Sequence, residues 1–245
     1  MRVERFPSRE EFSRAAADFI LEKCGERIGR SSRFSVALSG GKTPRPVYEQ
    51  LTLPPFRDAM PWERVHLFWS DERWVPPQHP ESNFGMAFET FISQMPIPAQ
   101  NVHPVPVDAG SPEEAAAKYD RTMQVYFRGQ DRGRGSPACF DLILLGVGAD
   151  GHTASLFPGS PLLEERSRWA AAEFPPPGSS PPVPRVTLTL PVINAARCVL
   201  FLASMAGKRE VLRRVLDCPG GPGEGLPAAM VRPRGELVWF LHDES

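Results

Sequence analysis

The sequence predicts an α/β protein with a mostly parallel sheet, helices on both faces of that sheet, and a single domain spanning residues 1–245. Short, nearly continuous apolar segments, which are typical of strands buried on both faces, alternate with longer segments of helical periodicity. Strands are also predicted on both sides of each Gly- and Pro-rich segment, so these segments are interpreted as surface loops. The loops cover residues 128–137, 174–184 and 218–227.

The first helix is predicted over residues 9–28. Ser8 is a suitable N-cap, Glu10 and Glu11 complement the helix dipole, and apolar residues then recur on one face. A proline is tolerated in the first turn of a helix, which allows the next helix to begin near Pro44. The remaining elements predicted up to residue 127 are strands at 34–38 and 65–69 and helices at 82–92 and 112–127.

The second half of the chain continues the alternation of strands and helices. Short apolar segments predict strands at 141–145, 185–190, 198–203 and 236–241. One further helix, at 207–216, is expected to place Val211, Leu212 and Val215 on its inward face. These elements complete the predicted sheet and its covering helices.

The composition is that of an ordinary soluble globular protein, with 41% hydrophobic and 23% charged residues among 245. A net charge of −1 and the lack of a basic cluster argue against a nucleic-acid partner. The N-terminus lacks the apolar core of a signal peptide, and no apolar run is long enough to span a membrane. We therefore expect a cytoplasmic protein that binds neither membranes nor nucleic acid. We also expect a monomer, although none of these observations fixes the oligomeric state.

The four cysteines are widely separated and lack any C-x-x-C spacing. Cys24, Cys139 and Cys198 lie in apolar segments, so they are predicted to be small buried hydrophobic residues. This usage is typical of a reducing compartment, in agreement with the cytoplasmic expectation.

Three predicted strands end in polar, charged or Gly-containing segments, namely SGGKTP, SDER and GVGADGH. In parallel α/β sheets, ligands bind in the crevice outside the carboxyl ends of the strands. Three such ends in one sheet predict a single composite site, and this convergence is stronger evidence than any one motif.

The SGGKTP segment, residues 39–44, is the first part of this site. It is not a Walker A loop, because that pattern requires glycine at the position of Val36. A Gly40–Gly41 turn before a helix allows successive backbone N–H groups to point at an anion, and the hydroxyls of Ser39 and Thr43 can donate as well. The alternative is a plain strand–helix turn.

The SDER segment offers Asp71, Glu72 and Arg73 immediately after a predicted strand. The planar guanidinium of Arg73 is suited to binding a phosphate or a carboxylate. The alternative is a solvated loop with an ion pair, which three adjacent charges commonly form. The position beside the other two segments favours a site.

The GVGADGH segment matches the G-x-G-x-x-G spacing of a dinucleotide-binding loop. It lies past the middle of the chain, however, and Pro158 and Pro161 prevent the long helix that such a loop opens. We interpret the glycines as allowing close approach of a small ligand to Asp150 and His152. Asp150 can orient His152, whereas the other histidines show no metal-ligand spacing, and no G-x-S-x-G motif is present.

Arg185 and Lys208 are the last candidates for the site. Arg185 begins a predicted strand, and Lys208 lies in the first turn of a predicted helix, where a cation is unfavourable to the helix dipole. An anionic ligand would account for that placement. The alternative is that both are ordinary solvated cations.

Several of these stretches, taken in order, resemble the family of the 6-phosphogluconolactonases. They are VALSGGKTPRPVYEQL, FWSDERWVPPQHPESNFGM, LILLGVGADGHTASLFPGS and RVTLTLPVINAARCVLFLASMAGKREVL, with a similar C-terminal stretch LPAAMVRPRGELVWFL. The resemblance runs from about residue 34 to residue 241. The pattern GxGxDGHxASLFP is specific to the family, whereas SGGxTP is shared with related enzymes.

The resemblance implies a Rossmann-like fold, shared with glucosamine-6-phosphate deaminases, without a metal or nucleotide cofactor. It implies hydrolysis of 6-phospho-D-glucono-1,5-lactone in the oxidative pentose phosphate pathway, so that the partner is a small sugar-phosphate lactone. It also implies that His152 is the general base, and that Asp71 and Asp150 lie close to the reacting end of the substrate.

The same resemblance implies that the SGG loop, Arg73, Arg185 and Lys208 surround the phosphate of the substrate. The sequence departs from the family pattern near that lysine. Met205 stands where the family has a glycine three residues before it, and Gly207 is displaced to the adjacent position.

A glucosamine-6-phosphate deaminase is the first alternative function. Deaminases resemble this sequence through DGH but then carry an acidic residue that partners the histidine in ring opening. Here Ser155, Leu156 and Phe157 follow, and the next acid is Glu164, which favours hydrolysis. A catalytically inactive sugar-phosphate sensor is the second alternative, against which the intact DGH motif argues.

Overall fold

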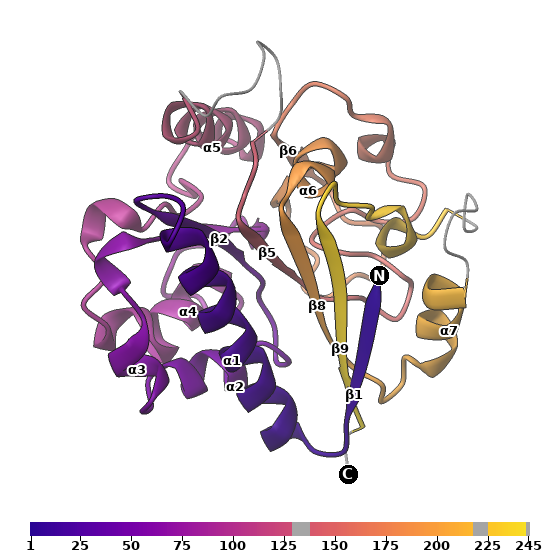
Figure 1. Cartoon of the computed structure of the whole chain (residues 1–245). Helices are drawn as coiled ribbons and strands as arrows, with labels where there is room; N and C mark the ends of the chain where they lie inside the picture. The colour runs from indigo at the N-terminus through magenta and orange to yellow at the C-terminus, as the bar shows by residue number, and fades with distance from the viewer. Residues whose placement is uncertain (129–137, 218–224, 244–245) are drawn as a thin grey trace.

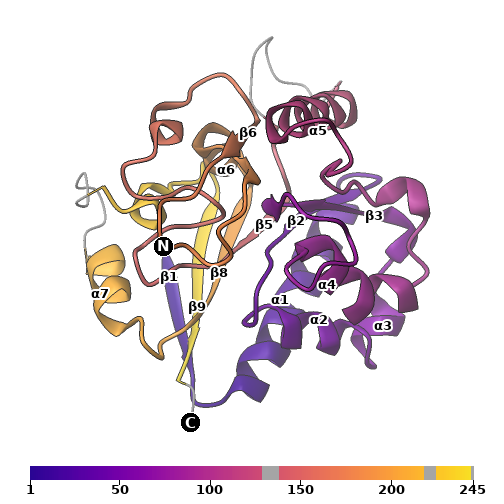
Figure 2. The ribbon, with the colours of Figure 1, turned by 180° about the vertical axis from the view of Figure 1, so that it is seen from behind.

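A six-stranded parallel sheet forms the centre of the computed structural model, which describes residues 1–128, 138–217 and 225–243 (Figures 1 and 2). The strands lie side by side in the order β1 (Arg2–Phe6), β9 (Glu236–His242), β8 (Cys198–Ser204), β5 (Leu142–Leu145), β2 (Phe34–Leu38) and β3 (Val65–Trp69). Every neighbouring pair runs parallel. The predicted mostly parallel α/β fold is confirmed.

Both faces of this sheet are buried, because successive side chains of each strand enter different hydrophobic cores. In β5, Leu142 and Leu144 belong to one core, whereas Ile143 and Leu145 belong to the other. The same alternation holds along β8. This arrangement explains why the strands appear in the sequence as continuous apolar runs.

Helices cover both cores. The first core contains apolar side chains of α1 (Arg9–Ile28), α2 (Arg45–Leu51), α3 (Phe56–Ala59) and α4 (Asn83–Thr90). The second contains those of α5 (Pro112–Tyr126), α6 (Leu190–Ala195) and α7 (Arg209–Asp217). The predicted N-cap of α1 is present, since the Ser8 hydroxyl accepts a hydrogen bond from the backbone N–H of Glu11 at 3.1 Å. Short 3₁₀ turns lie at Trp62–Arg64, Ile92–Gln94, Ala99–Asn101, Pro161–Glu164 and Pro227–Met230.

A second, antiparallel sheet was not predicted. It contains β4 (Asp71–Arg73), β7 (Arg185–Leu188) and β6 (Ala170–Glu173) in that order. The segment 185–190 therefore does not join the parallel sheet, and its strand ends at Leu188 because α6 begins at Leu190 with a proline in its first turn. The SDER segment is also not a loop after a strand, since its last three residues form β4.

Two further predictions needed correction. Strand β1 was missed because its residues are only exposed or partly buried, which leaves no apolar run in the sequence. Helix α7 begins at Arg209, so Lys208 precedes the helix instead of lying in its first turn. The loop at 174–184 lies within the described residues, whereas the other two predicted loops fall largely outside them.

The prediction that three of the cysteines are buried is confirmed. Cys24, Cys139 and Cys198 are all buried. Among the described residues, no helix combines the length and the apolar character needed to cross a membrane.

The amino-terminal edge of the sheet is held by a buried carboxylate. Asp141, directly before β5, accepts hydrogen bonds from the backbone N–H and the hydroxyl of Ser35 at 2.9 and 2.8 Å. Its other oxygen lies 2.7 Å from Nε of Arg27 and 3.2 Å from Nε of Arg197. One carboxylate therefore joins β2, α1 and the start of β8.

We expect Asp141→Ala to lower the free energy of unfolding by about 2–4 kcal/mol, because two guanidinium groups lose their ion-pair partner and a buried serine loses its hydrogen-bond acceptor. Ligand binding at the site described below should not change, since Asp141 lies at the opposite edge of the sheet. Urea unfolding measures the loss. Asp58→Ala, which removes an exposed carboxylate paired with Arg57, is the control and should cost less than about 1 kcal/mol.

Candidate active site

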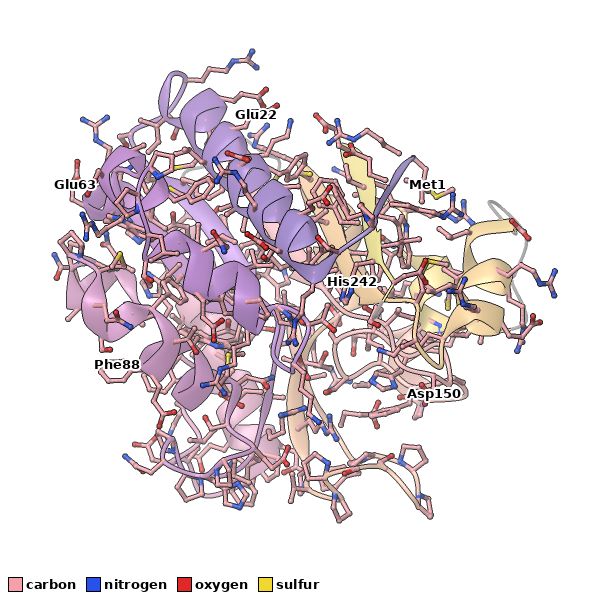
Figure 3. The ribbon with its side chains drawn as sticks, turned by 90° about the horizontal axis from the view of Figure 1, so that it is seen from below. Met1, Glu22, Glu63, Phe88, Asp150 and His242 are labelled. Carbon is pink, nitrogen blue, oxygen red and sulfur yellow. The ribbon has the colours of Figure 1, made fainter. Side chains whose placement is uncertain are left out.

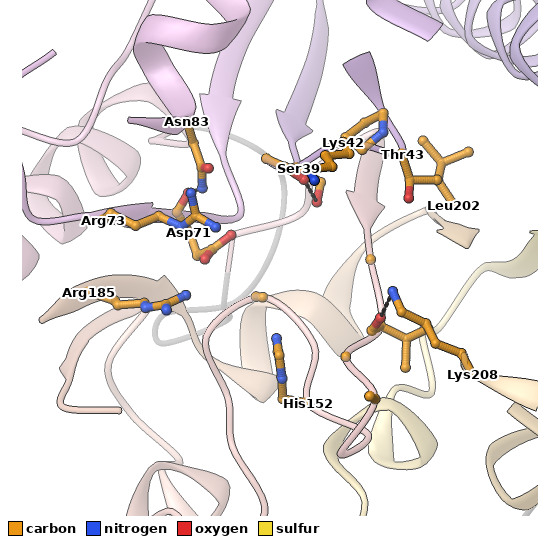
Figure 4. A pocket seen from close by; sticks show the side chains of 18 residues that line it. Ser39, Lys42, Thr43, Asp71, Arg73, Asn83, His152, Arg185, Leu202 and Lys208 are labelled. Atoms are coloured by element: carbon orange, nitrogen blue, oxygen red, sulfur yellow. Dashed lines mark hydrogen bonds between the residues drawn. The ribbon is translucent and has the colours of Figure 1, made fainter. Parts of the chain in front are cut away.

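A cavity of about 300 Å³ opens at the carboxyl ends of the parallel strands (Figure 4). Figure 3 views the molecule from this end and labels Asp150 and His242, the last residue of β9. Nine predicted site residues line the cavity: Ser39, Gly40, Gly41, Thr43, Asp71, Arg73, His152, Arg185 and Lys208. Asp150 does not line it and contacts His152 instead.

The Gly-rich turn after β2 is held in place by a buried tyrosine on α2. The hydroxyl of Tyr48 donates to the carbonyl of Ser39 at 2.7 Å and accepts from its backbone N–H at 3.1 Å. Gly41 has a φ of +94°, a conformation that side chains other than glycine rarely adopt. A Cβ on Gly40 would lie 1.7 Å from Oδ1 of Asn83, so glycine is required at this contact as well.

Two arginines face each other across the antiparallel sheet. Arg73 on β4 and Arg185 on β7 are paired residues of the ladder, and like charges placed directly opposite destabilise such a pair. Arg73 donates to the carbonyl of Glu81 at 2.7 Å, and Arg185 donates to the carbonyl of Pro181 at 3.0 Å. Both Nε atoms are buried and have no hydrogen-bond partner among the residues that the structure describes. Nη1 of Arg73 lies 3.5 Å from the partly exposed carboxylate of Glu81, so one acidic side chain stands beside two guanidinium groups. The pair could therefore bind a further anion.

The side chains that line the cavity carry an excess of positive charge. Lys42, Arg73, Arg185 and Lys208 contribute four cations, against one lining carboxylate, Asp71. Burial lowers the pKa of Arg185, and the nearby Asp71 opposes that shift. An anionic ligand would stabilise the charged forms of these groups.

His152 and Asp150 form a hydrogen-bonded pair beside the cavity. Nδ1 of the imidazole lies 2.6 Å from Oδ1 of Asp150, and the same oxygen accepts from the backbone N–H of His152 at 3.1 Å. Because a carboxylate can only accept, Nδ1 carries a proton, and in the neutral imidazole the lone pair is therefore on Nε2. The ring of His152 extends into the cavity between the arginine pair and Lys208 (Figure 4). This histidine can accept a proton from a molecule bound there.

The glycines of the GVGADG segment serve this pair. A Cβ on Gly148 would lie 2.2 Å from Nδ1 of His152 and 2.6 Å from Oδ1 of Asp150. Gly151 has a φ of +85°, and a Cβ there would meet Leu226 at 2.7 Å. The second and third glycines of the motif are thus explained by the space beside His152 and by the turn directly before it.

We expect Gly148→Ala to lower kcat by about 10–100-fold, because the added methyl group displaces the imidazole from its partner. The thermal stability should fall much less than the activity. Gly25→Ala, in the last turn of α1, is the matched control, since a Cβ there meets nothing within 4 Å. A Gly148→Ala enzyme with normal turnover would show that the His152–Asp150 geometry is not needed.

Asp71 is held by residues from two other segments. Oδ2 of Asp71 accepts from the hydroxyl of Ser155 at 2.6 Å, and the backbone N–H of Ser155 donates to Oγ1 of Thr187 at 3.1 Å. The side-chain amide of Asn83 donates to the carbonyl of Asp71 at 2.8 Å. Asn83 and Ser155 were not selected as site residues, because no local motif marks a residue whose role depends on a contact distant in the sequence.

Lys208 reaches the cavity from the end of β8. Gly207, with a φ of +66°, turns the chain directly before it, and Nζ donates to the carbonyl of Val147 at 2.7 Å. Lys208 therefore joins the turn before α7 to the loop that carries His152. Across the described ranges, no three His, Cys, Asp or Glu side chains form a group that could hold a metal ion.

These features define a parallel α/β protein whose cationic cavity, with a histidine–aspartate pair at its edge, is suited to an anionic small molecule. The family model for glucosamine-6-phosphate isomerases/6-phosphogluconolactonase matches residues 7–239. The chain belongs to this family.

Similar proteins agree with this assignment. A 6-phosphogluconolactonase from Nostoc is 38% identical over 239 residues, which are 98% of this chain and 94% of the relative. One from Synechocystis is 41% identical over 226 residues, covering 92% and 89% of the two chains. The crystal structure of 6-phosphogluconolactonase from Thermotoga maritima has a TM-score of 0.81 at 34% identity, covering 98% of this chain and 99% of the other.

Proposed function

We propose that this protein hydrolyses 6-phospho-D-glucono-1,5-lactone to 6-phosphogluconate, a reaction of the oxidative pentose phosphate pathway. The observation that carries the proposal is the orientation of His152. Its Nδ1 is occupied by Asp150, and its ring extends into a cavity lined by four cations. Many anionic substrates would fit such a cavity. We choose the lactone because the similar proteins are named 6-phosphogluconolactonase.

The phosphate of the lactone is bound by the Gly-rich turn and the basic residues. Backbone N–H groups at Gly40 and Gly41 provide donors for its oxygens. Arg73 and Arg185 present two guanidinium groups from one side of the cavity, and Lys208 faces them from the other (Figure 4). Each charged hydrogen bond contributes on the order of 1.5–3 kcal/mol, and this binding energy orients the lactone over His152.

The chemistry requires one base and no activated nucleophile on the protein. Nε2 of His152 removes a proton from a water molecule as its oxygen attacks the lactone carbonyl, C1. The tetrahedral intermediate then collapses, the bond between C1 and the ring oxygen breaks, and the imidazolium returns the proton to that leaving oxygen. Asp150 stabilises the imidazolium between the two steps. Backbone N–H groups near the Gly-rich turns stabilise the oxyanion.

Asp71 contributes to the reacting end in this proposal. Ser155 occupies one of its carboxylate oxygens, and the residue as a whole lines the cavity. An ionised carboxylate held in this way accepts hydrogen bonds from hydroxyl groups of the sugar. Asp71 thereby helps to align C1 with His152.

Deamination of glucosamine 6-phosphate is less well supported by the site. Deaminases of this family carry an acidic residue shortly after the histidine, and this residue assists ring opening. Here the corresponding stretch holds Ser155, which is buried and donates to Asp71, and Leu156, which is buried in the core. Among the described residues lining the cavity, Asp71 is the sole carboxylate. A lactone needs no such acid, because its ring oxygen leaves only after the carbonyl has been attacked.

A coupled assay tests the proposed function. A dehydrogenase generates the phosphorylated lactone from glucose 6-phosphate, and proton release is followed with and without this protein. We expect a clear acceleration over spontaneous ring opening, and no ammonia release from glucosamine 6-phosphate. Opening at the spontaneous rate would contradict the proposal, and binding of 6-phosphogluconate without acceleration would identify a sensor instead.

A further inference from the structure

Glu72 is a buried carboxylate that lies between two cavity residues but does not line the cavity itself. Its side chain is on the opposite face of β4 from those of Asp71 and Arg73, as the alternation of a strand requires. Only 1% of the residue is exposed. Burial raises the pKa of Glu72 to about 7, although backbone N–H groups stabilise its charged form. A charged group in this position is costly, so its contacts need an explanation.

The carboxylate of Glu72 accepts four hydrogen bonds. Oε1 accepts from the backbone N–H groups of Arg73 and Asn83, both at 2.7 Å. Oε2 accepts from the backbone N–H of Phe84 at 2.6 Å and from the hydroxyl of Ser82 at 3.3 Å. Glu72 thus joins β4 directly to the first turn of α4.

Capping of α4 alone does not account for this arrangement. The helix already has its own N-cap, because the hydroxyl of Ser82 accepts from the backbone N–H of Gly85 at 3.0 Å. What Glu72 adds is a connection between two cavity residues, since Arg73 and Asn83 donate to the same oxygen.

Through this connection, Glu72, Asn83, Asp71 and Arg73 form a closed set of contacts beside the cavity, which we call the ring. Asn83 donates from its side-chain amide to the carbonyl of Asp71 and packs against Gly40, where it leaves no space for a Cβ. Arg73 donates to the carbonyl of Glu81, which lies directly before the N-cap of α4. A shift of the first turn of α4 would therefore move Asn83, the Gly-rich turn and the guanidinium of Arg73 together.

We propose that Glu72 is a positioning residue that fixes Arg73 and Asn83 relative to Asp71, so that the anion-binding side of the cavity is formed before the ligand arrives. It acts through these neighbours and does not touch the ligand. The identity of the ligand rests on the proposed function. His152 and Asp150 belong to the loop after β5, outside this ring, so ligand binding depends on Glu72 more than the chemical step does.

The test compares Glu72→Gln with matched variants by two measurements. Titration calorimetry gives the Kd for 6-phosphogluconate, and the coupled assay gives KM and kcat. We expect Glu72→Gln to raise Kd and KM about tenfold, because one of its acceptors becomes a donor facing backbone N–H groups. The kcat should stay within about threefold of the wild-type value. Glu72→Asp, which keeps the charge on a shorter side chain, should show a smaller change in the same direction.

Ser111→Ala is the control for a purely structural effect. It removes the N-cap of α5, where the Ser111 hydroxyl accepts from Glu114 at 3.2 Å, and should change neither Kd nor KM. Asn83→Ala serves in a double-mutant cycle. If Glu72 acts through Asn83, the combined variant should bind about as weakly as the weaker single variant.

Additive effects of Glu72→Gln and Asn83→Ala would overturn the proposal, as would a Kd within about twofold of wild type in Glu72→Gln. Global unfolding of both Glu72 variants, seen by circular dichroism, would also overturn it by showing a role in folding alone. A wild-type protein that binds 6-phosphogluconate without hydrolysing the lactone would contradict the proposed function. The Kd values of the Glu72 variants would still test the positioning role, because they need no hydrolysis.

Discussion

Replacing His152 by alanine is expected to lower kcat/KM for the lactone by about 10²–10⁴-fold, the usual contribution of one positioned general base. Binding of 6-phosphogluconate and the folded structure should be largely retained. His152 is partly exposed at the edge of the cavity, and its ring contacts Phe157 without filling a core position. Steady-state kinetics with the coupled assay and calorimetry with the product measure the two effects separately.

His66→Gln is the matched control for this variant. His66 lies near the amino end of β3, away from the cavity, with Nδ1 3.2 Å from Nε2 of His103. Burial lowers the pKa of both imidazoles to about 4, so both are neutral in the assay. The control should keep kcat/KM within about twofold of wild type. Near-normal turnover in His152→Ala would remove this residue from the mechanism.

Arg73→Ala and Arg185→Ala are each expected to raise KM by about 10–100-fold, because each removes charged hydrogen bonds of about 1.5–3 kcal/mol to the phosphate. The kcat should change less, since neither side chain reaches the carbonyl that reacts in the proposed geometry. Lysine at either position keeps the charge but loses the planar fork, so Arg185→Lys should recover only part of the affinity. Steady-state kinetics and product titration measure both effects.

Arg166→Ala is the control for the loss of one positive charge. Arg166 is exposed and pairs with Glu164 outside the cavity, so its KM should match the wild-type value. An unchanged KM in Arg73→Ala or Arg185→Ala would exclude that arginine from phosphate binding. A raised KM in the Arg166 control would instead indicate a general electrostatic effect.

Much of the parallel sheet was predictable from local sequence alone. The strands Phe34–Leu38 and Val65–Trp69 and the helix Arg9–Ile28 begin and end at the predicted residues, because apolar runs and an N-cap serine mark them. The antiparallel sheet was not predictable in the same way. Its strands have three or four residues each, and so short a segment does not specify the direction of its partner.

The features of the site also separate into those that local sequence predicts and those that depend on contacts distant in the chain. The pairing of His152 with Asp150 is local, since the two are separated by a single residue, and the sequence predicts it. The Gly-rich turn is also local, because the conformation of Gly41 depends on its own backbone. The roles of Asn83, Ser155 and Glu72 are not, since each depends on contacts with segments that lie 10 or more residues away in the chain.

By itself, therefore, the sequence determined the parallel α/β fold, the edge of the sheet at which the cavity opens, and the histidine that lines it. Only the tertiary structure decided which charges meet there. Arg73 and Arg185 become opposite residues because β4 and β7 pair in antiparallel register. Such a register is set by the packing of the whole chain, and it brings together two guanidinium groups whose positive potential an anionic ligand would relieve.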